Sequence, residues 1–378
     1  MAGKSGLVTA VDRVPLLDLG RQYAPLKEEL DAAVLRVMAH GRFINGPEVA
    51  EFEKAAAGYV GAKHAIGVAS GTDALLVALR AVGVGPDTEV IMPTFTFFAT
   101  AGTVHNLGAK PVFVDIDPDT YNLDPARIEA VISNKTRAIM PVHLFGQCAD
   151  MTPLLKVADA HGIPVVEDAA QALSASHGEQ MAGTIGKLGC FSFFPTKNLG
   201  CLGDGGLIVT DDDELSELIR KLKAHGAKPK YYHQLVGYNS RLDTIHAAAL
   251  LVKLPHLDAW SRHRRVNAAR YDELLADVPV RRPTDAGRGY HIYNQYTIEL
   301  DRRDEFREHL RSRNVGHEVY YPVPLHRQEC FAHLGYNKGD FPVSERAVGR
   351  VCALPIFPEL TPDEQDYVVQ AVKDFVSR

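Results

Sequence analysis

The chain has 378 residues, 46% of them hydrophobic and 23% charged, and a net charge of -6. This composition excludes a disordered or fibrous protein, and the lack of excess basic residues argues against nucleic acid or an anionic membrane as the main partner. The five cysteines form no CxxC pair, so we expect no disulfide framework, no metal site and a reducing, cytoplasmic setting. We also expect no signal peptide and no membrane-spanning helix, because no apolar run is long enough for either.

The first large block alternates short apolar runs with helical patterns. The runs predict seven strands, at 64–70, 89–93, 110–116, 136–144, 164–169, 188–194 and 205–210. The helical patterns lie between the early strands, at 73–82, 125–132 and 152–162. This alternation predicts an α/β fold with a mainly parallel seven-stranded sheet. Only a short Gly-rich segment joins the last two runs, so we expect that pair to be antiparallel.

The second part of the chain has a different pattern. Residues 241–277 predict a long helix interrupted near Pro255. Strand patterns at 291–300 and 316–323 and helical patterns at 304–313 and 361–376 follow it. We therefore predict a large domain over 1–255 and a smaller α+β domain over 256–378.

Lys197 and Asp168 are the main candidates for catalysis. Lys197 follows a predicted strand in a Gly-rich turn. Partial burial would lower its proton affinity and make it nucleophilic toward an aldehyde; the alternative is an ordinary surface lysine. Asp168 ends the apolar strand of VVEDAAQA and needs a cationic or hydrogen-bonding partner there, such as a protonated pyridine nitrogen. A helix N-cap or a structural ion pair is its alternative.

The sequence indicates a phosphate-binding site where the first predicted strand meets the helix that follows it. Gly71 lets the backbone approach an anion, Thr72 adds a hydroxyl, and the helix N-terminus supplies free N–H groups. The alternative is an ordinary capped helix. Ser192 precedes Lys197 on the same strand, and its hydroxyl could reach the same phosphate.

Aromatic and amide side chains complete the set. Phe95, Phe97 and Phe98 follow a strand end, where one of them could stack on a flat ring or could simply pack in the core. Gln171 lies three residues after Asp168 and could face the same ligand. A lysine, an acid for a pyridinium nitrogen, an aromatic ring and a phosphate site are together the requirements of pyridoxal 5'-phosphate.

The sequence resembles the DegT/DnrJ/EryC1/StrS family of pyridoxal-phosphate sugar aminotransferases. The resemblance runs from residues 41–53 to 354–360 and is carried by ordered motifs: ASGTDAL, MPTFTFFATA, PVFVDIDPDTYNLDP, PVHLFGQCADM, VVEDAAQA, FSFFPTKNLG, GDGG and GYNSRLDTIHAA. It implies the fold-type I architecture of aspartate aminotransferase and a homodimer. One departure is Phe97, where some members have Trp or Tyr.

The resemblance also implies roles for residues of this chain. Lys197 would hold the cofactor as a Schiff base and Asp168 would pair with the ring nitrogen. Gln171 would face the ring hydroxyl and Phe97 would stack on the ring. The phosphate contacts would be Gly71, Thr72, Asp73 through its backbone, and Ser192, with Asn239 reaching the cofactor of the other subunit.

The implied reaction is transamination from L-glutamate to a nucleotide-linked keto-sugar. A dTDP-4-keto-6-deoxyhexose aminated at C-4 is the first expectation, and a dTDP-3-keto-6-deoxyhexose aminated at C-3 is the alternative. A cyclitol aminotransferase, a dehydratase that uses pyridoxamine phosphate, and a non-catalytic sugar-nucleotide sensor stand further back; the dehydratases have His where this chain has Lys197. The candidate substrate contacts are Lys228, Lys230, Tyr231, Tyr232, Tyr321 and His326.

Overall fold

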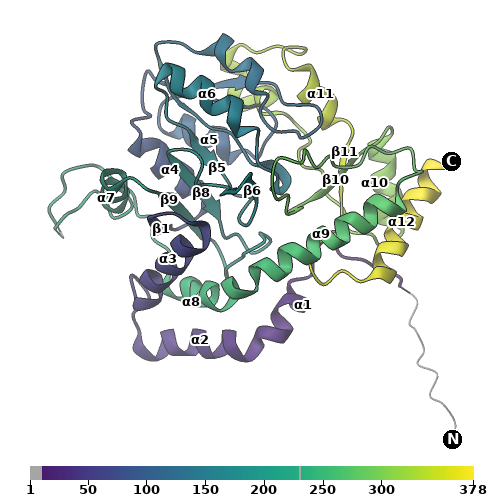
Figure 1. Ribbon diagram of the computed structural model, residues 1–378, viewed down its shortest axis with the longest axis horizontal. Helices are drawn as coiled ribbons and strands as arrows, with labels where there is room; N and C mark the ends of the chain where they lie inside the picture. The colour runs from purple at the N-terminus through teal and green to yellow at the C-terminus, as the bar shows by residue number, and fades with distance from the viewer. Residues whose placement is uncertain (1–10, 230) are drawn as a thin grey trace, which may run out of the picture.

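The computed structural model describes residues 11–229 and 231–378. Its larger part is a sheet covered by helices on both faces, and its smaller part lies at the side where the chain ends (Figure 1). The strands of the large sheet are β1 (His64–Val68), β2 (Glu89–Pro93), β3 (Lys110–Val114), β4 (Thr136–Ile139), β5 (Val166–Asp168), β8 (Leu188–Ser192) and β9 (Gly206–Thr210). Each lies within one of the seven predicted runs.

The large sheet consists of two hydrogen-bonded groups of strands, in the orders β1-β9-β8-β5 and β3-β2-β4. Isolated parallel bridges from Ile139 to Val165 and from Val142 to Asp168 join them between β4 and β5. The pairs β5–β8, β2–β3 and β2–β4 are parallel, whereas β9 is antiparallel to both β1 and β8. The prediction of a mainly parallel sheet with an antiparallel last pair is confirmed.

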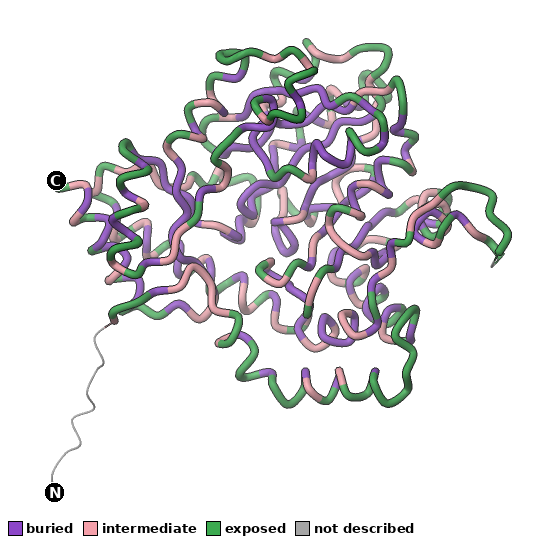
Figure 2. The backbone as a smooth tube through the Cα atoms, turned by 180° about the vertical axis from the view of Figure 1, so that it is seen from behind, coloured by how far each residue is buried: buried purple, intermediate pink, exposed green. Residues whose placement is uncertain are grey.

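The two faces of the sheet are covered by different helices. On one face, α4 (Gly71–Ala81), α5 (Ala99–Asn106) and α7 (Asp213–Leu222) share a hydrophobic cluster with the strands. On the other, α3 (Pro47–Val60) and α8 (Thr244–Lys253) cover β1, β8 and β9, and α6 (Met151–His161) covers β2, β3 and β4. Buried residues accordingly concentrate in the centre of the molecule (Figure 2).

The prediction of a helix over 125–132 is wrong in type, because the structure has two short 3-10 turns there, Pro125–Arg127 and Glu129–Val131. The apolar residues of this segment have helical spacing. However, the Asp124 side chain accepts a hydrogen bond from Ala126 N at the first turn, and the backbone becomes extended at Ile132, so a longer helix does not form. A small hairpin of β6 (Ser176–His177) and β7 (Gln180–Met181) leads from β5 to β8.

The interruption near Pro255 is a 3-10 turn, Leu254–His256, between α8 and the long α9 (Leu257–Leu274). In the smaller part, β10 (Tyr296–Glu299) pairs antiparallel with β11 (Val351–Leu354). Its helices are α10 (Arg303–Ser312), α11 (Pro342–Val348) and α12 (Pro362–Val376), and its 3-10 turns are Leu325–Arg327 and Glu329–Leu334. The strand predicted at 316–323 is wrong, since only Glu318 makes a bridge there, to Ala353.

The N-terminal segment contributes to the smaller part as well. Val14 belongs to its hydrophobic cluster and pairs with Val315, and Arg21 binds Glu364 of α12 through two hydrogen bonds of 2.8 and 2.6 Å. Helices α1 (Leu19–Tyr23) and α2 (Lys27–His40), with the 3-10 turn Ala24–Leu26 between them, then run along the lower edge of Figure 1 to α3. The described residues at the start of the chain thus pack on its end.

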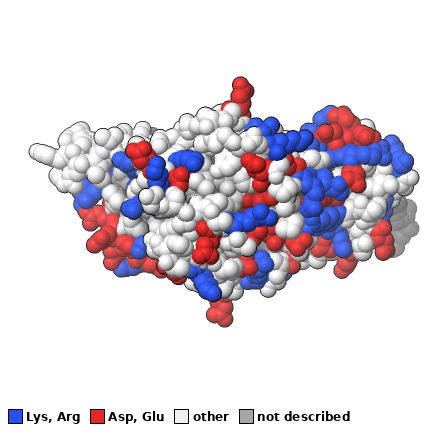
Figure 3. All heavy atoms as spheres, turned by 90° about the horizontal axis from the view of Figure 1, so that it is seen from above, with Lys and Arg blue, Asp and Glu red and all other residues white. Residues whose placement is uncertain are grey.

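The surface carries both charge signs. Figure 3 shows basic and acidic side chains mixed on one face of the molecule, as the small net charge predicts. Within residues 11–229 and 231–378, no helix has the length and apolarity to cross a membrane. The same residues contain no group of three or more His, Cys, Asp or Glu side chains suited to hold a metal ion.

Candidate active site

The candidate residues gather at one edge of the sheet because of strand direction. The parallel strands β5 and β8 end at Asp168 and Ser192, and β1, which is parallel to β8 across β9, ends just before Ser70. Ligands in α/β sheets bind at the carboxyl edge of the strands. The segments predicted to hold the lysine, the acid and the phosphate therefore meet at one place.

Lys197 lies in the bend that follows β8. Its N–H donates to Phe194 O at 2.9 Å, and the loop closes so tightly that a Cβ at Gly200 would come within 2.3 Å of Pro195 O. Burial lowers the pKa of the Lys197 amine from 10.5 to about 8, and the negative charge of Asp168 opposes this shift. A lowered pKa is what the predicted role of Lys197 as a nucleophilic amine requires.

Asp168 is buried, with 4% of its surface exposed, at the end of β5. Its Oδ2 accepts a hydrogen bond of 2.9 Å from the hydroxyl of Thr100, and its Oδ1 accepts one of 3.2 Å from Ala170 N. Burial raises the pKa of Asp168; the two hydrogen bonds and the nearby Lys197 and His143 oppose that rise. The carboxylate is therefore poised to take a cationic partner.

A second carboxylate, Glu167, supports the same strand from the other side. It accepts hydrogen bonds from Gly183 N, Ile185 N and Gly186 N at 2.6–2.8 Å and lies 2.7 Å from His143 Nε2. Ala149 N donates to His143 Nδ1, so the proton of that ring is on Nε2 and points to Glu167. Sequence analysis missed both residues, although Glu167 stands in VVED beside the predicted acid.

The phosphate site has a close approach of two elements. A Cβ at Gly71 would lie 2.6 Å from Ser192 Cβ, so the Ser192 side chain sits directly against the start of α4. Asp73 N donates to the N-cap Ser70 Oγ at 3.0 Å, which gives the backbone group predicted for phosphate a partner within the protein. The N–H groups of Gly71 and Thr72 have no acceptor within the helix, because the first turn never supplies one.

The amide of Gln171 is oriented by two neighbours. Its Oε1 accepts from Phe145 N at 2.8 Å and its Nε2 donates to the Tyr321 hydroxyl at 3.0 Å. The Tyr321 ring lies 6.1 Å from the ring of Phe97, whose side chain is 57% exposed. Tyr321 thus joins the predicted ring contacts, and Phe97 offers an aromatic face to a ligand.

His326 is not available in the same way. Its side chain is buried, with Nδ1 2.7 Å from the Thr94 hydroxyl and Nε2 3.1 Å from Glu345 Oε1. Burial lowers the pKa of His326, and Glu345 opposes this shift. Both ring nitrogens are engaged between β2 and α11, which favours a structural role over substrate contact.

The loop that follows α7 carries four of the predicted substrate contacts. It projects outward beside α7 (Figure 1), where Lys228 Nζ is 3.1 Å from Glu217 Oε1 of that helix. Tyr231 and Tyr232 are 78% and 70% exposed on the same loop, and Lys230 falls outside the described residues. Asn239 is exposed at the base of this loop, where it pairs with Ala224.

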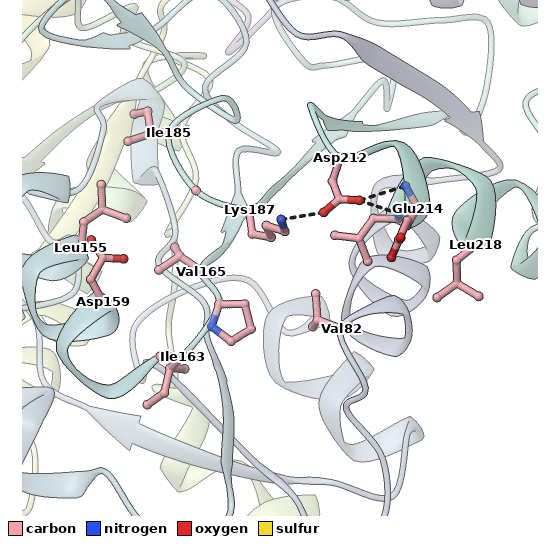
Figure 4. Close-up of a pocket in the computed structure, with 14 residues that line it drawn as sticks. Val82, Leu155, Asp159, Ile163, Val165, Ile185, Lys187, Asp212, Glu214 and Leu218 are labelled. Atoms are coloured by element: carbon pink, nitrogen blue, oxygen red, sulfur yellow. Dashed lines mark hydrogen bonds and ion pairs between the residues drawn. The ribbon is translucent and has the colours of Figure 1, made fainter.

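A hollow at another place on the molecule lacks these groups. It has a volume of about 670 Å³ between α6 and α7 and contains Val165, Lys187 and Asp212 (Figure 4). Its Lys187 is already paired with Asp212 at 2.6 Å. Neither Lys197 nor Asp168 lines it, so we place the chemistry at the sheet edge and not in this hollow.

The residues at the sheet edge fit pyridoxal 5'-phosphate. The cofactor needs an amine with a lowered pKa, a buried acid for its ring nitrogen, an aromatic face and N–H groups for its phosphate. Lys197, Asp168, Phe97 and the start of α4 meet these needs at one place, and the lack of a side chain at Gly71 lets Ser192 pack against the start of α4.

Comparison with known proteins gives matches over nearly the whole chain. The model of the DegT/DnrJ/EryC1/StrS aminotransferase family matches residues 25–373. A pleiotropic regulatory protein of Geobacillus stearothermophilus is 50% identical over 96% of this chain and 98% of its own length. The UDP-2-acetamido-2-deoxy-3-oxo-D-glucuronate aminotransferase of Pseudomonas aeruginosa is 46% identical over 92% and 96%. The dTDP-3-amino-3,4,6-trideoxy-alpha-D-glucose transaminase of Streptomyces venezuelae is 43% identical over 97% of each.

A solved structure is also similar to this chain over nearly its whole length. The crystal structure of DesV from S. venezuelae in complex with a ketimine intermediate superimposes with a TM-score of 0.95, at 43% identity, over 97% of this chain and 100% of that chain. Together with the family match and the site at the sheet edge, this similarity settles the class of the protein. The chain belongs to the DegT/DnrJ/EryC1/StrS aminotransferase family and is a pyridoxal-phosphate-dependent aminotransferase of fold type I.

Proposed function

We propose that this aminotransferase moves an amino group from L-glutamate to a keto-sugar carried on a nucleoside diphosphate. The observation that carries the proposal is a lysine with a pKa of about 8 that lies within electrostatic reach of the buried Asp168 at the carboxyl edge of the sheet. When bound, pyridoxal phosphate supplies an aldehyde that captures amino groups and a ring that takes up the electrons of a deprotonated carbon.

Two residues carry the proton and charge chemistry. Lys197 holds the cofactor between turnovers, and its Nζ, once released, takes a proton from the α-carbon of glutamate and later returns one to the sugar carbon. Asp168 keeps the ring nitrogen protonated, because a buried carboxylate gains most from a cationic partner. Positioned proton transfer of this kind contributes about 10²–10⁴-fold in rate.

The other contacts orient the cofactor. Gly71, Thr72 and Ser192 bind its phosphate, and Asp73 adds its N–H by sharing it with Ser70. Phe97 stacks on the ring and Gln171, fixed by Phe145 and Tyr321, faces the ring hydroxyl. Arrangement of these groups before substrate arrives lowers the entropic cost of reaction.

For the acceptor we propose a 3-keto-hexose, with the amine placed at C-3. The support comes from two relatives, at 46% and 43% identity. Their names specify sugars with an oxo or an amino group at carbon 3, the first sugar linked to UDP and the second to dTDP. The 4-keto sugar, which the sequence resemblance put first, becomes the competing acceptor.

We further propose a homodimer in which Asn239 reaches the phosphate of the other subunit's cofactor. The loop beside Asn239 supports this arrangement, since it projects from the rest of the protomer and exposes Tyr231 and Tyr232. In the dimer this loop, with Lys230, would hold the pyrophosphate and base of the sugar nucleotide, and Tyr321 would face the sugar.

The covalent role of Lys197 is tested by borohydride reduction of the cofactor-loaded protein and peptide mapping. We expect the label on Lys197, because its amine is the one deprotonated beside Asp168, and none on Lys253, whose pKa burial also lowers but whose amine donates to Gly200 O. Lys197→Ala should keep its fold by circular dichroism and lose about 10²–10⁴-fold in kcat or more, since it removes the proton-transfer group. An unlabelled Lys197 would contradict the proposal.

The lowered pKa predicts the pH dependence of cofactor uptake. Only the unprotonated amine attacks the aldehyde, so the rate at which apoenzyme takes up the cofactor should rise about tenfold per pH unit below 8 and level off above it. Asp168→Asn removes the negative charge that raises this pKa, and should move the midpoint to lower pH. A rate that keeps rising toward 10.5, the value of an ordinary lysine, would show that burial does not act on Lys197.

The position of amination is tested with paired acceptors. The enzyme and glutamate are incubated with a dTDP-3-keto-6-deoxyhexose or with dTDP-4-keto-6-deoxyglucose, and NMR identifies the aminated carbon. We expect kcat/KM for the 3-keto sugar to be higher by about 100-fold or more, because a site built to bind a polar group at one carbon rejects its displacement. Preferential formation of the C-4 amine would refute the assignment. The same two sugars linked to UDP instead of dTDP test which nucleotide base the enzyme prefers.

The shared site is tested by subunit mixing. Dimers of Lys197→Ala and of Asn239→Ala are unfolded together, refolded and assayed. If Asn239 serves the other subunit, each mixed dimer regains one intact site, formed by Lys197 of one chain and Asn239 of its partner, and activity appears. If Asn239 serves its own subunit, no site in the mixture is complete and activity stays at the level of the separate variants.

A further inference from the structure

A threonine of α5 binds the acid of the site directly. The Thr100 hydroxyl lies 2.9 Å from Asp168 Oδ2, and Thr100 is fully buried. A carboxylate has no proton to give, so the direction is fixed: Thr100 donates and Asp168 accepts. A hydrogen bond to a charged acceptor in a buried place is among the stronger ones in proteins.

A second threonine extends this contact. Thr96 Oγ1 lies 3.2 Å from Thr100 Oγ1, and its side chain is buried with 3% exposed. Because Thr100 gives its proton to Asp168, its oxygen is left to accept the proton of Thr96. Such a chain polarises each member, which strengthens the bond that reaches the carboxylate.

The other oxygen of Asp168 is anchored too. Oδ1 accepts from Ala170 N at 3.2 Å. Of the groups that oppose the burial-induced rise in the pKa of Asp168, the Thr100 hydroxyl acts most strongly, ahead of the Ala170 N–H, Lys197 and His143. The carboxylate is thus fixed in orientation before any ligand arrives.

We propose that Thr100, supported by Thr96, is a positioning residue that keeps Asp168 charged and aimed at the ring nitrogen of the cofactor. The inference rests on the proposed role of Asp168. It predicts that loss of the hydroxyl weakens the contact between carboxylate and ring nitrogen, and leaves the contacts of the phosphate unchanged.

The test compares two ligands that differ only at that nitrogen. Apoenzyme is titrated with pyridoxal phosphate and with 1-deazapyridoxal phosphate, which has a carbon in place of the ring nitrogen. The ratio of the two affinities reports the contact with Asp168, whereas both ligands keep the aldehyde and the phosphate. For Thr100→Val, which has nearly the same shape, we expect the preference for pyridoxal phosphate to fall about tenfold, the usual scale of one hydrogen bond to a charged group.

Two controls separate this role from packing. Thr103→Val changes another buried threonine of α5, whose hydroxyl donates to Ala99 O at 2.9 Å, and should leave the ratio unchanged. Thr100→Ser keeps the hydroxyl and should restore most of the preference. Thr96→Val should lower the ratio by a smaller factor. If Thr100→Val does not fold, the ratio measured for Thr96→Val tests the positioning role in its place.

The outcomes are distinct. A wild-type ratio in Thr100→Val, or in Thr96→Val where only that variant folds, overturns the positioning role. A fall that Thr103→Val shares equally also overturns it, since packing of α5 would then explain the change. If the wild-type apoenzyme binds neither ligand and borohydride labels no lysine, the failure belongs to the proposed function instead.

Discussion

The site depends on two opposite charges brought together at the end of a buried sheet. Asp168 is almost completely buried, and that burial disfavours its charged form, while the same environment lowers the pKa of Lys197. Each charge partly offsets the cost of burying the other. An electron-accepting cofactor needs this combination, an amine that loses its proton readily beside a retained negative charge, whereas a lysine in water would keep its proton.

The parallel sheet makes this meeting possible. Strands of the same direction end at the same edge, so residues more than a hundred positions apart, such as Gly71 and Ser192, become neighbours. The close packing of Gly71 against Ser192 shows how little space the fold leaves there. The helices on both faces keep water from the strands, and the edge is where ligands can enter.

Buried polar groups around the acid are held by specific partners. Glu167, next to Asp168 on the strand, points to the opposite side and is satisfied by three backbone N–H groups and His143. Thr100 and Ala170 hold Asp168 on its own side. Adjacent carboxylates on one strand thus have separate sets of donors, which keeps both oriented in a region where an unpaired charge would be costly.

The sequence by itself determined the seven strands and their mainly parallel order, and it predicted which lysine, acid and glycine stand at their ends, because periodicity and strand-end position depend on local residues. It also predicted a helix at 125–132 and a strand at 316–323 that do not form, since capping and pairing partners decide such short segments. Only the tertiary structure revealed Thr100, Glu167 and His143 around the acid, and the engagement of His326 by Thr94 and Glu345. These contacts join residues from distant segments, and a single sequence holds no signal for which hydroxyl or ring the folded chain will bring to a given carboxylate.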